Sequence, residues 1–125
     1  MDSIVHFEIP ANDMVRTRTF YQQLFGWNIN THDSQYFLAE TTETKEWRPT
    51  APGAINGGFL QRNPIHKTPV LVIQVKDIDA YVSQIEKAGG KVLKGKESID
   101  SIGFSAYFED TEGNVMCLFQ PTATY

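Results

Sequence analysis

The hydrophobic pattern of this chain changes from strand-like to helix-like near its N-terminus. Apolar residues occupy every second position of 4–9, which predicts a strand with one buried face. In residues 14–25, Met14, Tyr21 and Leu24 then form an apolar stripe at helical spacing, which we predict to be buried. A capping aspartate precedes this stripe and a glycine follows it, so the pattern predicts a helix with both ends marked.

The same pattern returns in the second half of the chain. An apolar strand is predicted at 69–75 and a helix at 78–88, again between an aspartate and a pair of glycines. The capping residues Asp13 and Asp77 are 64 positions apart. A strand, a cap, a helix and a stop signal that recur at one offset indicate a duplicated structural unit.

Three further strands follow each predicted helix. Residues 41–53 read as a loop and 61–67 as a link between the halves. Halves of about 60 residues are too small for separate cores, so we predict one domain built from two βαβββ modules, at about 1–62 and 63–125. The fold class is α+β, and because one helix covers one face of each sheet, we expect curled, mainly antiparallel sheets around a cleft. The additional strands are predicted at 27–31, 35–40, 54–60, 91–95, 103–109 and 114–120.

Composition and charge exclude some classes of function. The net charge is −4 and the basic residues are scattered, which argues against a nucleic-acid-binding surface. The longest apolar run, 69–75, is too short to span a bilayer, and the N-terminus lacks the pattern of a signal peptide. The single cysteine, Cys117, forms no internal disulfide and suits a reducing compartment. We therefore expect a cytoplasmic protein with no nucleic-acid or membrane partner.

Four short motifs occur in a characteristic order. They are VHFEIP at 5–10, FYQQLFGW at 20–27, VKDID at 75–79 with AGG at 88–90, and FEDTEGN at 108–114. With these motifs the chain resembles the vicinal oxygen chelate superfamily, the group of glyoxalases, bleomycin-resistance proteins and extradiol dioxygenases. The resemblance implies the paired βαβββ fold, a small-molecule ligand or substrate, and a homodimer.

The resemblance also implies where a divalent metal ion would bind. Members that use a metal place one ligand on the first and one on the last strand of each module, which here selects His6, Gly57, Val70 and Cys117. Glycine and valine side chains have no donor atom, and zinc sites usually have three or four protein ligands. We therefore predict that no metal or other cofactor binds in the family's manner. The alternative is a divalent ion held with His6 as its main ligand.

His6 and Glu8 alternate with the apolar residues of the first strand, so they share a face. An imidazole beside a carboxylate suits general acid–base catalysis, and these two residues are the catalytic candidates. The alternative is a histidine that is hydrogen-bonded in the wall of the cleft without chemistry. Cys117 has no base or cation near it in sequence, so it reads as a small apolar filler more than as a nucleophile.

Aromatic residues are the remaining indication of a binding site, because apolar walls with a few polar groups suit a flat organic ligand. Packing in the core or in a dimer interface is the competing interpretation. Trp47 lies in the 41–53 loop, where it could fold over a ligand or anchor the loop on the protein's own surface. The residues predicted to contact a ligand are Trp27, Trp47, Gly57, Phe59, Val70, Tyr107, Cys117 and Phe119.

Three functions remain open from the sequence. The first is a glyoxalase-related protein with a degraded metal site that binds an organic molecule in an aromatic cleft. The second is a metal-dependent lyase, isomerase or dioxygenase of the glyoxalase type that uses His6; the absent ligands count against lactoylglutathione lyase activity. The third is a structural or regulatory protein without a ligand.

Overall fold

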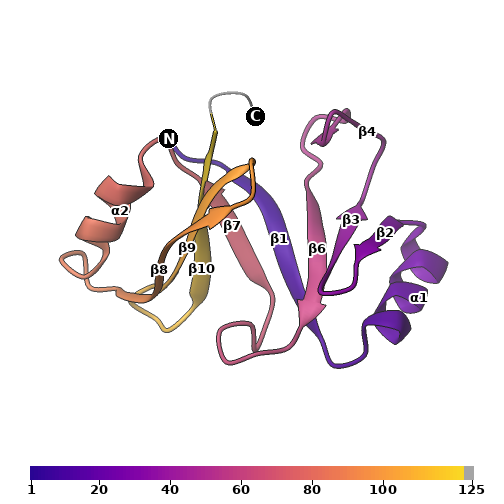
Figure 1. Ribbon diagram of the computed structural model, residues 1–125, viewed down its shortest axis with the longest axis horizontal. Helices are drawn as coiled ribbons and strands as arrows, with labels where there is room; N and C mark the ends of the chain where they lie inside the picture. The colour runs from indigo at the N-terminus through magenta and orange to yellow at the C-terminus, as the bar shows by residue number, and fades with distance from the viewer. Residues whose placement is uncertain (123–125) are drawn as a thin grey trace. The chain divides into compact units, whose positions relative to one another are not determined.

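The computed structural model describes residues 1–122, which fall into two compact units. The N-terminal unit is His6–Pro69, and the C-terminal unit combines Met1–Val5 with the chain from Val70 onward. Figure 1 shows that each unit contains one helix and one set of long strands. Within the described part of the chain, no helix has the length and apolar character needed to cross a membrane.

The N-terminal unit contains the first βαβββ module. Its sheet has the order β2-β3-β6-β1, in which β6 and β1 are parallel and the other pairs are antiparallel. A parallel pair needs a long connection, and here α1, β2 and β3 lie between the two strands in sequence. The elements are β1 (Ile4–Ala11), α1 (Met14–Phe25), β2 (Asn28–Asp33), β3 (Tyr36–Glu40) and β6 (Asn56–Gln61).

The C-terminal unit repeats this arrangement. Its sheet has the order β7-β10-β9-β8, again with a parallel pair of first and last strand, β7 and β10. Two such modules confirm the α+β fold class predicted from the repeat. The elements are β7 (Val70–Gln74), α2 (Ile78–Ile85), β8 (Lys91–Ile99), β9 (Gly103–Glu109) and β10 (Val115–Pro121).

Helix α1 begins and ends where its capping residues predict. The Asp13 carboxylate accepts a hydrogen bond from the Arg16 backbone N–H at 3.0 Å, and Gly26 adopts the left-handed conformation at φ 70°. Tyr21 packs on the buried core and stacks on Trp27, with ring centroids 5.0 Å apart. The prediction that Leu24 is buried is wrong, because its side chain is 62% exposed.

Helix α2 is shorter than predicted. It ends at Ile85, and the next three residues form turns instead of continuing to Ala88. The N–H groups of Ala88 and Gly90 both donate to the Ile85 carbonyl, and Gly89 lies at φ 98°. The left-handed glycine lets the chain turn back onto the last helical carbonyl, so the helix closes early.

The predicted loop at 41–53 contains a small hairpin, which corrects the sequence assignment. Strands β4 (Thr44–Lys45) and β5 (Arg48–Pro49) pair across a two-residue turn. Both turn residues, Glu46 and Trp47, have positive φ values of 50° and 68°. This geometry suits hairpin twist but is usually supplied by Asn-Gly, which explains why the sequence did not suggest it.

The core of the N-terminal unit centres on Phe59. This side chain is fully buried and contacts the Tyr21 and Trp27 rings. We expect Phe59→Ala to lower the free energy of unfolding by about 3–5 kcal/mol, because it leaves a cavity. Leu24→Ala on the exposed side of α1 should cost less than about 0.5 kcal/mol. Urea unfolding of both variants tests the assignment, and a larger loss for Leu24→Ala would contradict it.

Candidate functional site

The first strand separates a core face from a polar face. Phe7 and Ile9 pack against the core beside α1, so His6 and Glu8 lie on the other side of the sheet. Strand β6 runs parallel to β1 and pairs His6 with Asn56 and Glu8 with Gly58. We call this surface the polar face and define it by His6, Glu8, Tyr36, Asn56 and Gly58.

His6 is held by the phenol of Tyr36. The His6 Nε2 and the Tyr36 hydroxyl are 2.6 Å apart, and the two rings lie nearly parallel, 6.3 Å between centroids. Gly58 makes this contact sterically feasible, because a Cβ there would lie 2.2 Å from the Tyr36 ring. Burial lowers the pKa of His6 below its usual value, and the negative charge of Glu8 partly opposes this shift.

Glu8 forms a buried pair with His66, a residue of the link between the modules. The Glu8 Oε1 and His66 Nε2 atoms are 2.7 Å apart, and the side chains are only 11% and 5% exposed. Asn63 fixes the histidine, since its Oδ1 accepts the His66 backbone N–H at 2.8 Å and its Nδ2 lies 3.1 Å from His66 Nδ1. The sequence indicated a turn near Asn63 but gave no signal that His66 would reach Glu8.

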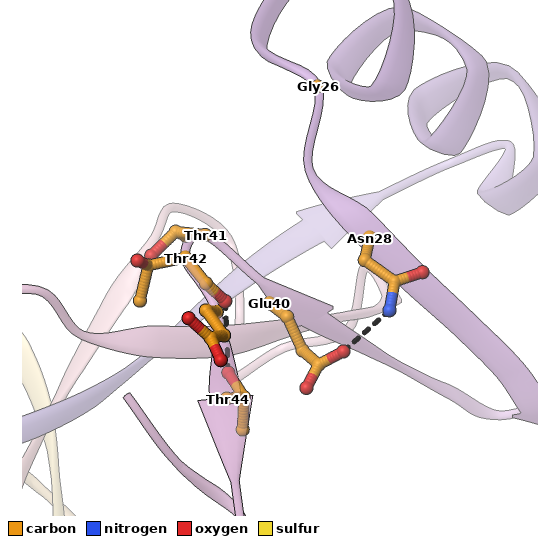
Figure 2. Close-up of a pocket in the computed structure, with 7 residues that line it drawn as sticks. Gly26, Asn28, Glu40, Thr41, Thr42 and Thr44 are labelled. Atoms are coloured by element: carbon orange, nitrogen blue, oxygen red, sulfur yellow. Dashed lines mark hydrogen bonds between the residues drawn. The ribbon is translucent and has the colours of Figure 1, made fainter. Parts of the chain in front are cut away.

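A polar pocket lies in the N-terminal unit where β2 and β3 meet the following loop (Figure 2). Its volume is about 430 Å³. The Asn28 amide donates to Glu40 at 2.6 Å, and no Lys or Arg lines the wall. We call it the Glu40 pocket; its lining residues are Gly26, Asn28, Glu40, Thr41, Thr42, Glu43 and Thr44.

Asn56 connects the Glu40 pocket with the polar face. Its Nδ2 donates to the Thr44 hydroxyl at 2.8 Å, and its Oδ1 accepts the Thr41 backbone N–H at 2.9 Å. Because Asn56 is also the register partner of His6, one side chain holds the pocket wall against the strand beside the histidine. No motif of the sequence indicated Asn56 or Glu40, since only strand register brings them to this place.

Three residues predicted to contact a ligand lie on the core face of the N-terminal sheet. Gly57 pairs with Phe7, and a Cβ there would lie 2.3 Å from the Phe7 ring, so this position faces away from His6. Phe59 is fully buried, and Trp27 packs beside it. The residues of β6 on the same face as His6 are Asn56, its register partner, and Gly58.

The C-terminal unit gathers the other predicted residues on one face. Val70 is fully buried and Cys117 almost so, in one cluster with the half-buried rings of Tyr107 and Phe119. The Cys117 thiol lies 3.4 Å from the Leu118 carbonyl. This burial matches a small apolar filler more closely than an accessible nucleophile. Trp47, by contrast, is 71% exposed at the tip of the hairpin.

The four positions implied for a metal do not fit a divalent ion. Gly57 and Val70 provide hydrocarbon only, Cys117 packs among apolar side chains, and the Nε2 of His6 is bonded to Tyr36. Across residues 1–122, no three His, Cys, Asp or Glu side chains come close enough together to hold a metal ion. The side chains present therefore do not reproduce the family's ligand set.

The lowered pKa of His6 predicts a loss of stability in acid. The folded protein binds a proton at His6 less readily than the unfolded chain, whose histidine pKa is about 6.5. The stabilisation that neutral His6 contributes to the free energy of unfolding is complete above the pKa of the unfolded chain. It declines as the pH falls toward the lower pKa of His6 in the folded protein. Urea midpoints between about pH 7.5 and 5 should therefore fall less in His6→Gln than in the wild type.

The matched control for that experiment is His32→Gln, because His32 is an exposed histidine of the same unit. It should follow the wild-type pH dependence. Equal slopes for His6→Gln and wild type would contradict the assignment of the acid sensitivity to His6.

The contact between Gly58 and Tyr36 yields a separate prediction. Gly58→Ala places a methyl group inside the Tyr36 ring, so Tyr36 must move and its bond to His6 should break. We expect a loss of about 1–3 kcal/mol in the free energy of unfolding. Gly95→Ala, in strand β8 with open space around its Cβ, should change stability by less than about 0.5 kcal/mol. Similar values for the two variants would refute the steric role of Gly58.

Comparison with known proteins places this chain in a family. The family model of the Glyoxalase/Bleomycin resistance protein/Dioxygenase superfamily matches residues 3–118. A glyoxylase-like domain-containing protein of Didymella fabae is 33% identical over 112 residues, which cover 86% of this chain and 84% of that protein.

Solved structures share the fold at low identity. A methylmalonyl-CoA epimerase in complex with methylmalonyl-CoA and NH4+ is 18% identical, with a TM-score of 0.67 and coverage of 98% of this chain and 96% of that one. The NAD-dependent benzaldehyde dehydrogenase structure from Legionella pneumophila is 10% identical, with a TM-score of 0.65 and coverage of 94% and 98%. Since the family model spans nearly the whole chain, this protein belongs to the Glyoxalase/Bleomycin resistance protein/Dioxygenase superfamily, the vicinal oxygen chelate group.

Proposed function

We propose that this protein binds a small organic molecule on its N-terminal unit without the help of a metal ion. One observation carries the proposal: the Tyr36 phenol is bonded to the His6 nitrogen and fills the space above Gly58. In metal-using members of the family, the corresponding histidine would instead coordinate the ion. Binding is the family activity that does not require that ion.

The Glu40 pocket supports this proposal and indicates the kind of ligand. Its volume lies within the range of small-molecule sites, and carboxylate, amide and hydroxyl groups line it. A ligand with hydroxyl or amine donors would satisfy these acceptors. The hairpin that carries Trp47 starts at Thr44 in the pocket wall, so its indole remains a predicted ligand contact. The ligand contacts predicted at Tyr107 and Phe119 belong to the C-terminal unit and remain a separate prediction.

A glyoxalase-type enzyme is the second candidate. It is favoured by the buried Glu8–His66 pair, which lies on the same face as His6 and resembles the paired groups used for proton transfer. In this alternative, His6 and Glu8 are the catalytic residues and a divalent ion would still bind at His6. A homodimer and a cytoplasmic location also remain predictions, and sedimentation velocity tests the first of them.

Metal content separates the two candidates. After purification without chelator, we expect fewer than about 0.1 divalent ions per chain, because the donor set is incomplete. Elemental analysis of the purified protein measures this value. A stoichiometric ion that is lost in His6→Ala and retained in His32→Ala would reject metal-independent binding and support the enzyme.

Ligand binding is tested by a thermal-shift screen of small molecules rich in hydroxyl or amine donors, followed by tryptophan fluorescence titration of the hits. Glu40→Gln should weaken binding about tenfold through loss of charge-assisted hydrogen bonds. Glu86→Gln, an exposed residue of the C-terminal unit, is the charge-matched control and should bind as the wild type does. A broad screen without any saturable ligand would favour a structural or regulatory role.

A further inference from the structure

A second cavity of the N-terminal unit lies at the start of α1, apart from the residues of the polar face. Its volume is about 330 Å³, and it shares no lining residue with the Glu40 pocket. The end of β1, the first two turns of α1 and Arg62 after β6 form its walls. The cavity therefore joins two segments that are distant in sequence, residues 10–20 and Arg62, and each contributes an arginine.

Arg62 is held in place by its neighbours. Its Nε donates to the Asn12 side-chain oxygen at 3.0 Å, one Nη donates to the Lys67 carbonyl, and its backbone N–H bonds to the Ala11 carbonyl at 2.9 Å. An arginine has five N–H donors, and these side-chain bonds use two of them. The guanidinium is thus oriented before any ligand arrives, which lowers the entropic cost of binding.

Arg16 occupies a position that does not favour the helix. It lies in the first turn of α1, where the helix dipole is positive and acidic side chains are the stabilising choice. Within residues 1–122, no carboxylate forms an ion pair with Arg16. A residue that breaks a local rule without an intramolecular partner suggests a role in binding an anion from outside.

The rest of the lining defines the shape and charge of an occupant. Phe20 follows Arg16 by one helical turn, so both share a face of α1, and its ring is 52% exposed. Asp13 is the one carboxylate of the wall, and it caps the Arg16 backbone N–H. Two guanidinium groups against one carboxylate leave the cavity positive, although the whole chain has a net charge of −4.

From this geometry we propose that the cavity is a binding site for a small organic anion. Arg62 and Arg16 bind its carboxylate or phosphate group, and the Phe20 ring contacts a flat apolar body. Guanidinium groups match the planar geometry of a carboxylate and the oxygens of a phosphate ester. This site is independent of the Glu40 pocket and of the metal question, so either proposal can fail while the other stands.

The test uses four probes: phenyl phosphate, benzoate, inorganic phosphate and the neutral benzyl alcohol. Two-dimensional amide NMR of the full chain should show saturable shifts at Arg16, Phe20 and Arg62 with phenyl phosphate or benzoate, at a Kd of about 1 mM or below. The tighter of these two identifies the preferred head group. Benzyl alcohol should give no saturable shift at these residues.

Variants make the assignment specific. Arg16→Gln and Arg62→Gln should each weaken phenyl phosphate binding about tenfold. Arg16→Gln keeps the fold, and in the absence of anion it should raise Tm by about 1–3 °C because it removes the charge that opposes the helix dipole. Phe20→Ala should weaken phenyl phosphate but leave inorganic phosphate unchanged.

Lys87→Gln on the C-terminal unit removes the same charge from an exposed site and should bind as the wild type does. The proposal is overturned if neither aromatic anion shifts these amides at about 10 mM, a concentration about tenfold above the expected Kd. It is also overturned if the two arginine variants bind like the wild type, or if Lys87→Gln loses as much affinity as they do.

Discussion

The alternation of side chains along β1 is the constraint on which the N-terminal unit depends. The same strand sends Phe7 and Ile9 into the core and His6 and Glu8 to the polar face. Because the period is two, a shift of one residue in the pairing with β6 would exchange the faces. The apolar packing beneath the sheet therefore also fixes where the two titratable groups above it lie.

Local order was predictable from the sequence, because caps and periodicity act between near neighbours. Asp13 and Gly26 mark the ends of α1 in both the sequence and the structure. The partners of the polar side chains were harder to predict. Tyr36 contacts His6 from 30 positions away in the sequence, and His66 contacts Glu8 from 58 positions away. Such contacts depend on register, which the pattern of one strand does not contain. The incorrect burial of Leu24 has a similar cause, as helical spacing does not say how wide the covered stripe is.

The burial of the Glu8–His66 pair needs a physical explanation. Burying two ionisable groups costs several kcal/mol, and a well-packed apolar pair is often as stable. Loss of one partner is far more costly than loss of both, because the other would stay buried without compensation. Asn63 strengthens the pair by orienting the imidazole through a backbone and a side-chain bond. The link between the modules is thereby fastened to the polar face at one defined point.

The contact between His6, Tyr36 and Gly58 also explains why one substitution at position 58 could not add a metal ligand. A donor side chain at position 58 has no room while the Tyr36 ring lies there, and removal of that ring alone leaves a glycine without a donor. Position 57 does not help, since it faces Phe7 on the core side. Two coordinated changes, at positions 36 and 58, are needed before position 58 could offer a ligand. The polar face is therefore organised around a phenol–imidazole contact that fills the space above Gly58.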